Sequence, residues 1–318
     1  MKKGWLAAFG LLLLNMQLMA APDYDTTFIE STIVLHTASG DITGTLTMPE
    51  QQSKIPVVLL IAGSGPTDRN GNNPMMKNES LLLLAHGLAL NRIASLRFDK
   101  RGIGESKDAG KMEADLRFED YIKDAADWIA LLKKDARFSK VFVAGHSEGS
   151  LIGMIAALNK ANGFVSIAGP GRSADKVLKE QLASQPPMVK DSSYPIIDSL
   201  TMGKTVENVP KMLFALFRPS VQPYIISWFH YDPQTEIKKL KIPVLILQGT
   251  NDLQVTVEDA NFLAKSNTKA KLALIKNMNH VFRIVEGDRK ENLAAYITPT
   301  LPISEELVSA ISTFVQQR

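Results

Sequence analysis

The sequence predicts an α/β protein with a mostly parallel central sheet that is flanked by helices. Short apolar runs alternate with segments of helical periodicity along most of the 318 residues, which is the pattern of a doubly wound sheet. A serine between two glycines, Ser147, stands where one apolar run meets an apolar helix. Hydrophobic residues make up 45% of the chain and charged residues 22%, which allows a large core and gives no sign of disorder.

The first residues have the layout of a signal peptide. Lys2 and Lys3 precede a short apolar run that ends in small residues, and we expect cleavage after Ala20. The predicted division is a signal peptide at 1–20 and one domain at 21–318. The mature chain would be exported, to the periplasm or out of the cell, with no stable membrane insertion. An uncleaved anchor is the alternative, which the shortness of the apolar run disfavours.

Charge and cysteine content exclude several classes of partner. Removing Lys2 and Lys3 from the 36 basic residues leaves 34, against 33 acidic ones. A nearly neutral chain gives no electrostatic reason to expect nucleic acid or a membrane surface as a partner. The chain has no cysteine, which excludes disulfides, a thiol nucleophile and a thiolate metal site. The oligomeric state cannot be predicted from these features.

The expected strands fall into two kinds. The first two alternate polar and apolar residues, as half-exposed antiparallel strands do, and a Ser-Gly-Asp turn joins them. The other runs are almost continuously apolar, which is typical of parallel strands that are buried on both faces. In chain order the expected strands are 28–36, 42–48, 55–62, 93–98, 140–144, 164–168, 242–247 and 271–275.

Helical periodicity appears between the strands, and one long segment departs from the alternation. Residues 168–242 contain no apparent strand but several prolines and short apolar helical pieces. We therefore expect a helical lid insertion after the sixth strand, at about 173–238, lying over the sheet edge. The helices expected elsewhere are 81–90, 118–132, 151–158, 257–265 and 305–315.

The stretch from Val141 to Gly153 shows why Ser147 stands between two glycines. A strand that turns sharply into a helix leaves no room for side chains two residues before and after the turn, and here these are Gly145 and Gly149. The arrangement G-x-S-x-G is typical of a nucleophile elbow, in which the serine hydroxyl protrudes at the start of a helix. We therefore interpret Ser147 as a nucleophile.

A serine hydroxyl needs a base, and the base needs an orienting carboxylate. His280 follows the last expected strand, whereas His86 lies in an apolar helical segment where we expect a core role. Asp252 follows the strand at 242–247, so it and His280 both come just after carboxyl strand ends. Rival carboxylates are Asp99, Asp232 and Glu148.

The developing oxyanion needs preorganised N–H donors. One expected donor is the backbone N–H of Glu148, directly after the nucleophile. The other is the backbone N–H of Ser64, in the glycine-rich turn that follows the strand at 55–62. A flexible surface turn is the alternative reading of that segment.

Four short blocks of the sequence resemble serine hydrolases of the α/β-hydrolase superfamily. In that superfamily the nucleophile, acid and base follow one another along the chain in the order of Ser147, Asp252 and His280 here. The resemblance covers almost the whole mature chain, and the nearest members are exported bacterial esterase-like or dienelactone-hydrolase-like proteins. It implies an α/β-hydrolase fold and a structural role for Asp99. The matching blocks are the elbow at 145–149, the D-x-R-G-x-G-x-S block at 99–106, the acid turn at 249–252 and the histidine loop at 279–280.

One block departs from the family. The oxyanion turn reads Ala62-Gly63 where many members have His-Gly, although a backbone donor needs no side chain. A run of three glycines, typical of lipases, is absent, which disfavours large lipid substrates.

Three functions remain open from the sequence. The first is a serine esterase that cleaves small or medium carboxylic esters through an acyl-enzyme, with no cofactor and no metal implied. The second is a peptidase or amidase that uses the same three residues. The third is a binding protein that keeps the fold without catalysis, which the complete set of nucleophile, acid and base disfavours.

Overall fold

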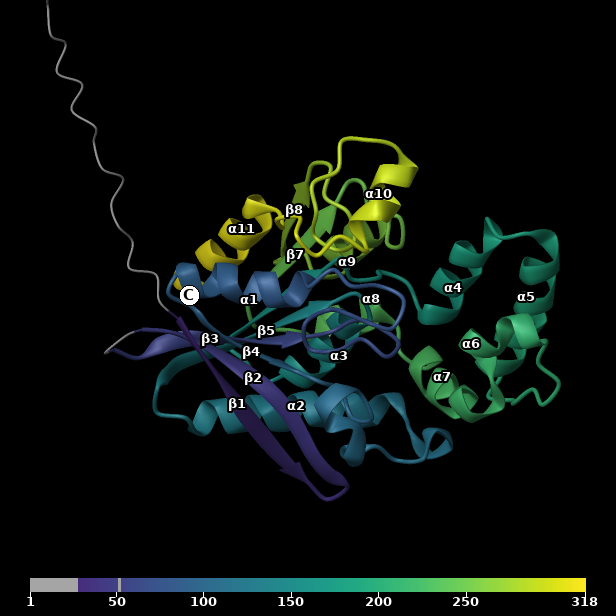
Figure 1. Ribbon diagram of the computed structural model, residues 1–318, viewed down its shortest axis with the longest axis horizontal. Coiled ribbons are helices and arrows are strands. Elements are labelled where there is room, and N and C mark those ends of the chain that lie inside the picture. Colours follow the sequence, from purple (N-terminus) through teal and green to yellow (C-terminus); the bar gives the residue numbers. More distant parts are fainter. Residues whose placement is uncertain (1–27, 51–52) are drawn as a thin grey trace, which may run out of the picture.

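The computed structural model describes residues 28–50 and 53–318. One eight-stranded sheet, in the order β1-β2-β4-β3-β5-β6-β7-β8, forms its centre (Figure 1). β2 pairs antiparallel with β1 and β4, and all other neighbours are parallel. The strands are β1 (Phe28–Thr37), β2 (Gly40–Pro49), β3 (Ile55–Ile61), β4 (Ala94–Phe98), β5 (Phe138–His146), β6 (Gly163–Ile167), β7 (Val244–Gly249) and β8 (Lys271–Ile275).

Every strand expected from the sequence is therefore present, with shifts of one or two residues at several ends. The mostly parallel sheet flanked by helices, which the sequence predicted, is confirmed. The predicted signal peptide at 1–20 lies outside the described residues. Among the described helices, none combines the length and the apolar character needed to cross a bilayer.

Helices cover both faces of the sheet because alternate strand residues point to opposite sides. In β3, Val57, Leu59 and Ile61 pack into one core, while Val58 and Leu60 pack into the other. The second core lies under α1 (Ser80–Leu90) and α11 (Glu305–Gln316), and the first lies under α2, α3 and α9 (Figure 1). These three helices are α2 (Phe118–Lys134), α3 (Glu148–Ala157) and α9 (Val257–Ser266).

The chain between β6 and β7 is helical and extends to one side of the sheet (Figure 1). We call residues 174–229 the cover; α8, which follows, packs instead against α3 and α9. The helices of this segment are α4 (Ala174–Ala183), α5 (Pro187–Thr201), α6 (Phe214–Phe217), α7 (Gln222–Phe229) and α8 (Pro233–Lys239), with the short 3₁₀ turns η3 (Lys211–Leu213) and η4 (Pro219–Val221). The remaining elements are α10 (Arg289–Ala295), η1 (Gly104–Ala109) and η2 (Glu113–Asp115).

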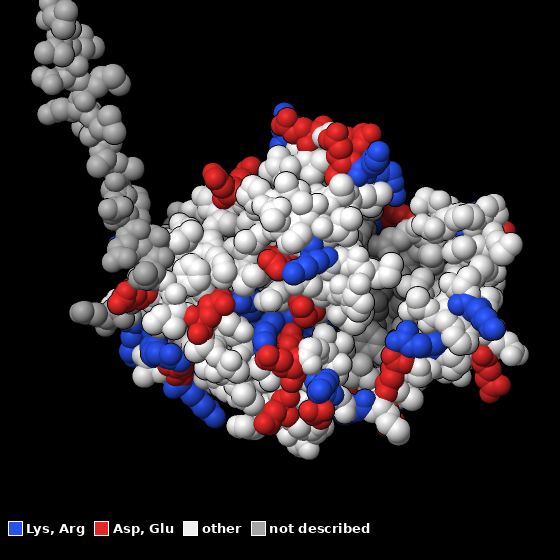
Figure 2. Space-filling view, viewed as in Figure 1, with Lys and Arg blue, Asp and Glu red and all other residues white. Residues whose placement is uncertain are grey.

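Charged side chains of both signs are scattered over the face in Figure 2, with no large area of one sign. The same view shows the surface hollowed where the cover meets the rest of the molecule. The carboxyl ends of the parallel strands β3, β5, β6, β7 and β8 lie at one edge of the sheet, and the residues that follow them form the candidate site.

Candidate active site

Ser147 occupies a strained turn between β5 and α3. Its φ is 54° and its ψ −123°, a backbone conformation that residues with side chains rarely adopt. A Cβ atom at Gly145 would lie 2.1 Å from the carbonyl oxygen of Gly149, and one at Gly149 would lie 2.4 Å from that of Ile61. Only glycine fits at either position, so the sequence G-x-S-x-G holds Ser147 at the tip of the turn.

Asp252 and His280 form a buried pair. His280 Nδ1 lies 2.8 Å from Asp252 Oδ2, and the two side chains are 5% and 1% exposed. The other carboxylate oxygen, Oδ1, accepts the N–H groups of Gln254 (2.7 Å) and Val255 (3.0 Å). Burial raises the pKa of Asp252, but the charge and hydrogen bond of His280, with these N–H groups, outweigh it and hold the pKa below its ordinary value. An ionised Asp252 therefore keeps a proton on His280 Nδ1 and leaves Nε2 free to act as a base.

His280 also lies against the elbow. His146, which precedes the serine, donates its Nε2–H to the backbone oxygen of His280 at 3.0 Å, and the two rings are 4.6 Å apart. Within residues 28–50 and 53–318, no hydrogen bond joins Ser147 Oγ to His280. Catalytic hydrogen bonds are commonly longer in a free enzyme than with substrate bound. The fold thus brings Ser147, Asp252 and His280 to the same edge of the sheet.

His146 is itself held neutral. Burial, followed by the nearby charge of His280, lowers its pKa to about 3. Because the acceptor of its Nε2 is a carbonyl oxygen, Nε2 carries the proton. His146 is therefore a fixed donor that holds the loop of His280 against the elbow, a role that its place beside the serine did not reveal.

The glycine-rich turn after β3 lies directly against the nucleophile. A Cβ atom at Gly63 would lie 3.2 Å from the Cβ of Ser147. In the part of the chain that the structure describes, the backbone N–H groups of Ser64 and Glu148 donate no hydrogen bond. Glu148 is the first residue of α3, where N–H groups lack helical acceptors and the helix dipole favours negative charge. Both predicted donors are thus free to bind an anionic oxygen near Ser147.

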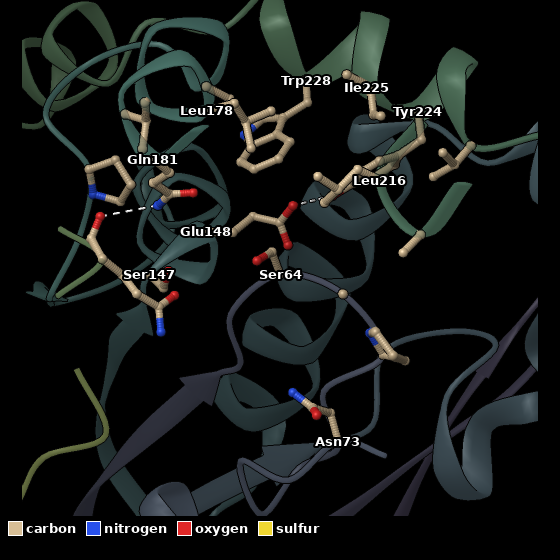
Figure 3. Close-up of a pocket in the computed structure, with 18 of the residues that line it drawn as sticks. Ser64, Asn73, Ser147, Glu148, Leu178, Gln181, Leu216, Tyr224, Ile225 and Trp228 are labelled. Atoms are coloured by element: carbon tan, nitrogen blue, oxygen red, sulfur yellow. Dashed lines mark hydrogen bonds between the residues drawn. The ribbon is translucent and has the colours of Figure 1, made fainter. Parts of the chain in front are cut away.

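Sequence reasoning missed a buried polar network beside this turn. Lys100 Nζ donates to the carbonyl oxygen of Gly63 (2.6 Å) and to Glu148 Oε2 (3.4 Å), and Tyr224 in α7 donates its hydroxyl to Glu148 Oε1 (2.5 Å). Figure 3 shows Glu148 between Ser64 and Tyr224. Burial lowers the pKa of Lys100, and Glu148 opposes that shift. Lys100 and Glu148 lie within the blocks at 99–106 and 145–149 that resemble the family, but nothing in the sequence indicates that the two side chains meet.

A cavity of about 640 Å³ opens above Ser147. Ser64, Ser147 and Glu148 line its base, and apolar side chains of the cover form its walls (Figure 3). Asp252 and His280 are not among the residues that line it. The apolar wall comprises Val177 and Leu178 of α4, Leu216 and Phe217 of α6, and Ile225 and Trp228 of α7. Among the aromatic residues of the cover, Phe217, Tyr224 and Trp228 line the cavity, whereas Phe214 is exposed.

The rival carboxylates have other partners. Asp99 accepts the N–H of Arg69 at 2.7 Å and that of Glu105 at 2.9 Å, which ties the turns after β3 and β4 together. This agrees with the structural role implied by the resemblance. Asp232 caps α8 by accepting the N–H of Gln234.

One histidine is not where the sequence placed it. His86, expected in the core, is partly exposed on α1, and its Nε2 lies 3.1 Å from Glu30 on β1. The apolar character of its neighbours concealed this, because α1 is apolar on nearly every side. His36 is exposed beside Asp41.

Parts of the sequence are similar to known proteins. A family model described as serine aminopeptidase, S33 (Hydrolase_4) matches residues 79–199, which include the elbow but neither Asp252 nor His280. Esterase EstD of Thermotoga maritima is 29% identical in an alignment of 295 residues that covers 87% of this chain. The match spans only 65% of the length of EstD.

Solved structures resemble the whole fold. Est1E of Butyrivibrio proteoclasticus, determined with ferulic acid bound, has a TM-score of 0.60 at 17% identity, covering 90% of this chain and 100% of Est1E. The α/β hydrolase GrgF of Penicillium sp. sh18 has a TM-score of 0.61 at 15% identity, covering 91% and 98%. At such low identity these likenesses establish the fold, which is that of the α/β-hydrolases.

Proposed function

We propose that this chain, an esterase-like α/β-hydrolase, cleaves carboxylic esters of small or medium size through an acyl-enzyme on Ser147. The observation that carries the proposal is the buried His280–Asp252 pair held against a strained serine turn. The N–H groups of Ser64 and Glu148, which donate no hydrogen bond among the described residues, would stabilise the oxyanion. The likeness to EstD, whose name describes an esterase, supports the same reaction.

The reaction would proceed in two halves. His280 Nε2 takes the proton of Ser147 as Oγ attacks the ester carbonyl, and the oxyanion binds the N–H groups of Ser64 and Glu148. Asp252 stabilises the resulting imidazolium, which then gives its proton to the leaving alcohol as the C–O bond breaks. His280 then takes a proton from water as the water oxygen attacks the acyl carbonyl, and it returns this proton to Ser147 Oγ as the acyl C–Oγ bond breaks and the acid leaves.

The cavity favours esters over the aminopeptidase alternative. An aminopeptidase needs an anionic group to bind the ammonium of its substrate, and Glu148 is the only carboxylate among the described residues that line the cavity. Both of its oxygens are already engaged, by Lys100 and Tyr224. The walls are mainly apolar and their charged residues, Arg172 and Arg218, are cations, so an aliphatic or aromatic acyl or alcohol group fits them better than an ammonium.

A substrate panel tests the proposal. Purified protein is assayed against p-nitrophenyl esters of increasing acyl length and against aminoacyl p-nitroanilides. We expect ester turnover that is lost on Ser147→Ala, with kcat falling on the order of 10⁵-fold and the melting temperature unchanged. Ser184→Ala, a change at an exposed serine of the cover, is the matched control. Amide turnover equal to ester turnover would favour the peptidase, and failure of Ser147 to react with a fluorophosphonate probe would favour a binding protein.

Export of the chain is part of the proposal. It is supported by Lys2, Lys3 and the apolar run that follows them. Fractionation of cells that express the chain with a C-terminal tag is expected to place it outside the cytoplasm, with Ala21 as its first residue. A cytoplasmic chain that still begins at Met1 would contradict this.

A further inference from the structure

Lys100 is a buried cation beside the candidate site. It follows β4, its side chain is 2% exposed, and its ammonium lies 5.1 Å from the ring centre of Tyr121. Burying a charge is costly unless it is hydrogen-bonded and paired. Its partners are the carbonyl oxygen of Gly63 and the carboxylate of Glu148. Both belong to the segments that supply the oxyanion donors.

The first contact fixes the direction of one donor. The carbonyl of Gly63 and the N–H of Ser64 belong to the same peptide unit, which is planar and trans, so they point in opposite directions. Holding the oxygen at 2.6 Å therefore fixes where the N–H points. A cation on the carbonyl oxygen also polarises the amide and makes its N–H a stronger donor.

The turn has little else to hold this peptide. In the part of the chain that the structure describes, no other group donates to the oxygen of Gly63. The next carbonyl, that of Ser64, accepts only the hydroxyl of Thr67 at 2.8 Å. Ser64 is exposed, and Gly65 has a φ of 71° with open space around it. Packing alone therefore does not determine the orientation of the peptide.

The contact between Lys100 and Glu148 concerns the other oxyanion donor, the N–H of Glu148. Glu148 contributes its backbone N–H to the oxyanion position, and its side chain is held by Lys100 on one oxygen and by Tyr224 on the other. One ammonium thus connects the turn after β3 with the first residue of α3. Tyr224 extends the connection to the cover.

We infer that Lys100 is a positioning residue for the oxyanion site, which orients the Gly63–Ser64 peptide and the start of α3. The inference rests on the proposed function, because it concerns a donor pair that acts only on a developing oxyanion. Its alternative is a purely structural role, in which Lys100 does no more than balance the buried charge of Glu148.

Two variants separate these roles. Lys100→Met keeps the length of the side chain and removes the donor, but leaves Glu148 without its cation. Lys100→Met combined with Glu148→Gln removes both charges, so no unpaired charge stays buried and the chain is expected to fold. Lys111→Met is the control, because Lys111 lies nearby on the surface and pairs with Asp120.

The readouts are kcat and KM on a p-nitrophenyl ester, together with the inhibition constant of an aryl trifluoromethyl ketone. This ketone forms a hemiketal with Ser147 whose oxyanion occupies the same position. We expect both Lys100 variants to lower kcat by about 10-fold to about 100-fold, where the upper limit is the effect of losing one oxyanion donor. The inhibition constant of the ketone should rise by the same factor. KM should stay within about threefold, since the ground state makes no use of the donors.

A double variant whose kcat returns to within about threefold of the wild type would overturn the inference, because charge balance would then suffice. A raised KM with unchanged kcat would overturn it as well. These outcomes leave the proposed function intact, since the wild type and Lys111→Met would still cleave the ester. A wild-type chain without ester turnover would instead refute the proposed function, and the inference with it.

Discussion

The two oxygens of Asp252 have different partners, and this determines what an amide would do in their place. In Asp252→Asn the oxygen would stay with the N–H groups of Gln254 and Val255, so the NH₂ group would face His280 Nδ1. Nδ1 would then accept a hydrogen bond and the proton would move to Nε2, where it blocks proton transfer from Ser147. We expect kcat on an ester to fall about 10⁴-fold. Stability should fall by about 1 kcal/mol, because the new NH₂ group also faces the Nε2 donor of Gln248, which lies 3.2 Å from Oδ2 of Asp252. A loss of kcat below about tenfold would mean that another acid orients the base.

His146 makes the protein sensitive to acid. Its pKa is about 3 in the fold, against an ordinary value of 6.5, so between these values the unfolded chain binds a proton that the folded chain does not. Stability therefore falls as the pH is lowered through this window. From pH 7 to pH 5 the free energy of unfolding should drop by about 2 kcal/mol on account of His146 alone.

Denaturant titrations at both pH values check this prediction. His146→Gln keeps a side-chain donor for the backbone oxygen of His280 and removes the titrating group. Its loss of stability between pH 7 and pH 5 should be smaller than that of the wild type by the stated amount. An equal loss in the two proteins would show that His146 binds a proton in the folded state.

At the scale of single elements, the elbow tolerates no added atom. Gly145→Ala would place a methyl group against the carbonyl of Gly149, and neither backbone can move without shifting β5 or α3. We expect a loss of more than about 3 kcal/mol or an insoluble protein. Gly203→Ala is the matched control: Gly203 has a φ of 74° but open space around it, so only backbone strain of about 1 kcal/mol applies. Similar melting temperatures for the two variants would contradict the packing argument.

Burial determines which helices and strands could be predicted from the sequence. The strands were predicted because residues buried on both faces give continuous apolar runs, as in β6, whose five residues are all buried. α10 was missed because it buries only Asn292 and Ala295, which leaves no periodic stripe. α5 contains Pro195 in its interior, where a proline removes one helical hydrogen bond, and this argues against a helix in a sequence-based reading.

At the scale of the whole molecule, a few polar contacts fasten the cover. Arg218 and Ser220 bind the carboxylate of Glu113, which lies outside the cover on η2, and hydrogen bonding to Arg218 is the main cause that lowers the pKa of Glu113. The groups are half-exposed, so Glu113→Gln should cost less than about 1 kcal/mol of global stability. We nonetheless expect faster amide hydrogen exchange at 211–221, because the variant weakens a local attachment.

The control for this prediction lies within the cover. Lys179 pairs with Asp198 and joins α4 to α5 without reaching the rest of the molecule. Lys179→Met should leave the exchange at 211–221 unchanged. Equal exchange in Glu113→Gln and the wild type would mean that the Glu113 contacts do not hold this part of the cover.

The candidate site residues could be predicted where a local sequence pattern indicates them. Ser147, Asp252 and His280 each follow a strand at its carboxyl end, so their meeting follows from the sheet topology. The Lys100–Glu148–Tyr224 network was not predictable, because its members come from the turn after β4, from α3 and from the cover, far apart in the sequence. Long-range polar pairing leaves no periodic trace, unlike the burial of a strand.

The position of the cover bears on how the substrate selectivity of the protein could be changed. Ser147, Asp252 and His280 all come from outside 174–229, whereas most of the apolar wall comes from inside it. Replacing the cover by another helical segment would therefore change the substrate selectivity and leave the reacting residues in place. The replacement should keep a hydroxyl at the position of Tyr224, which binds Glu148. Selectivity and reactivity would then be engineered as separate parts of one chain.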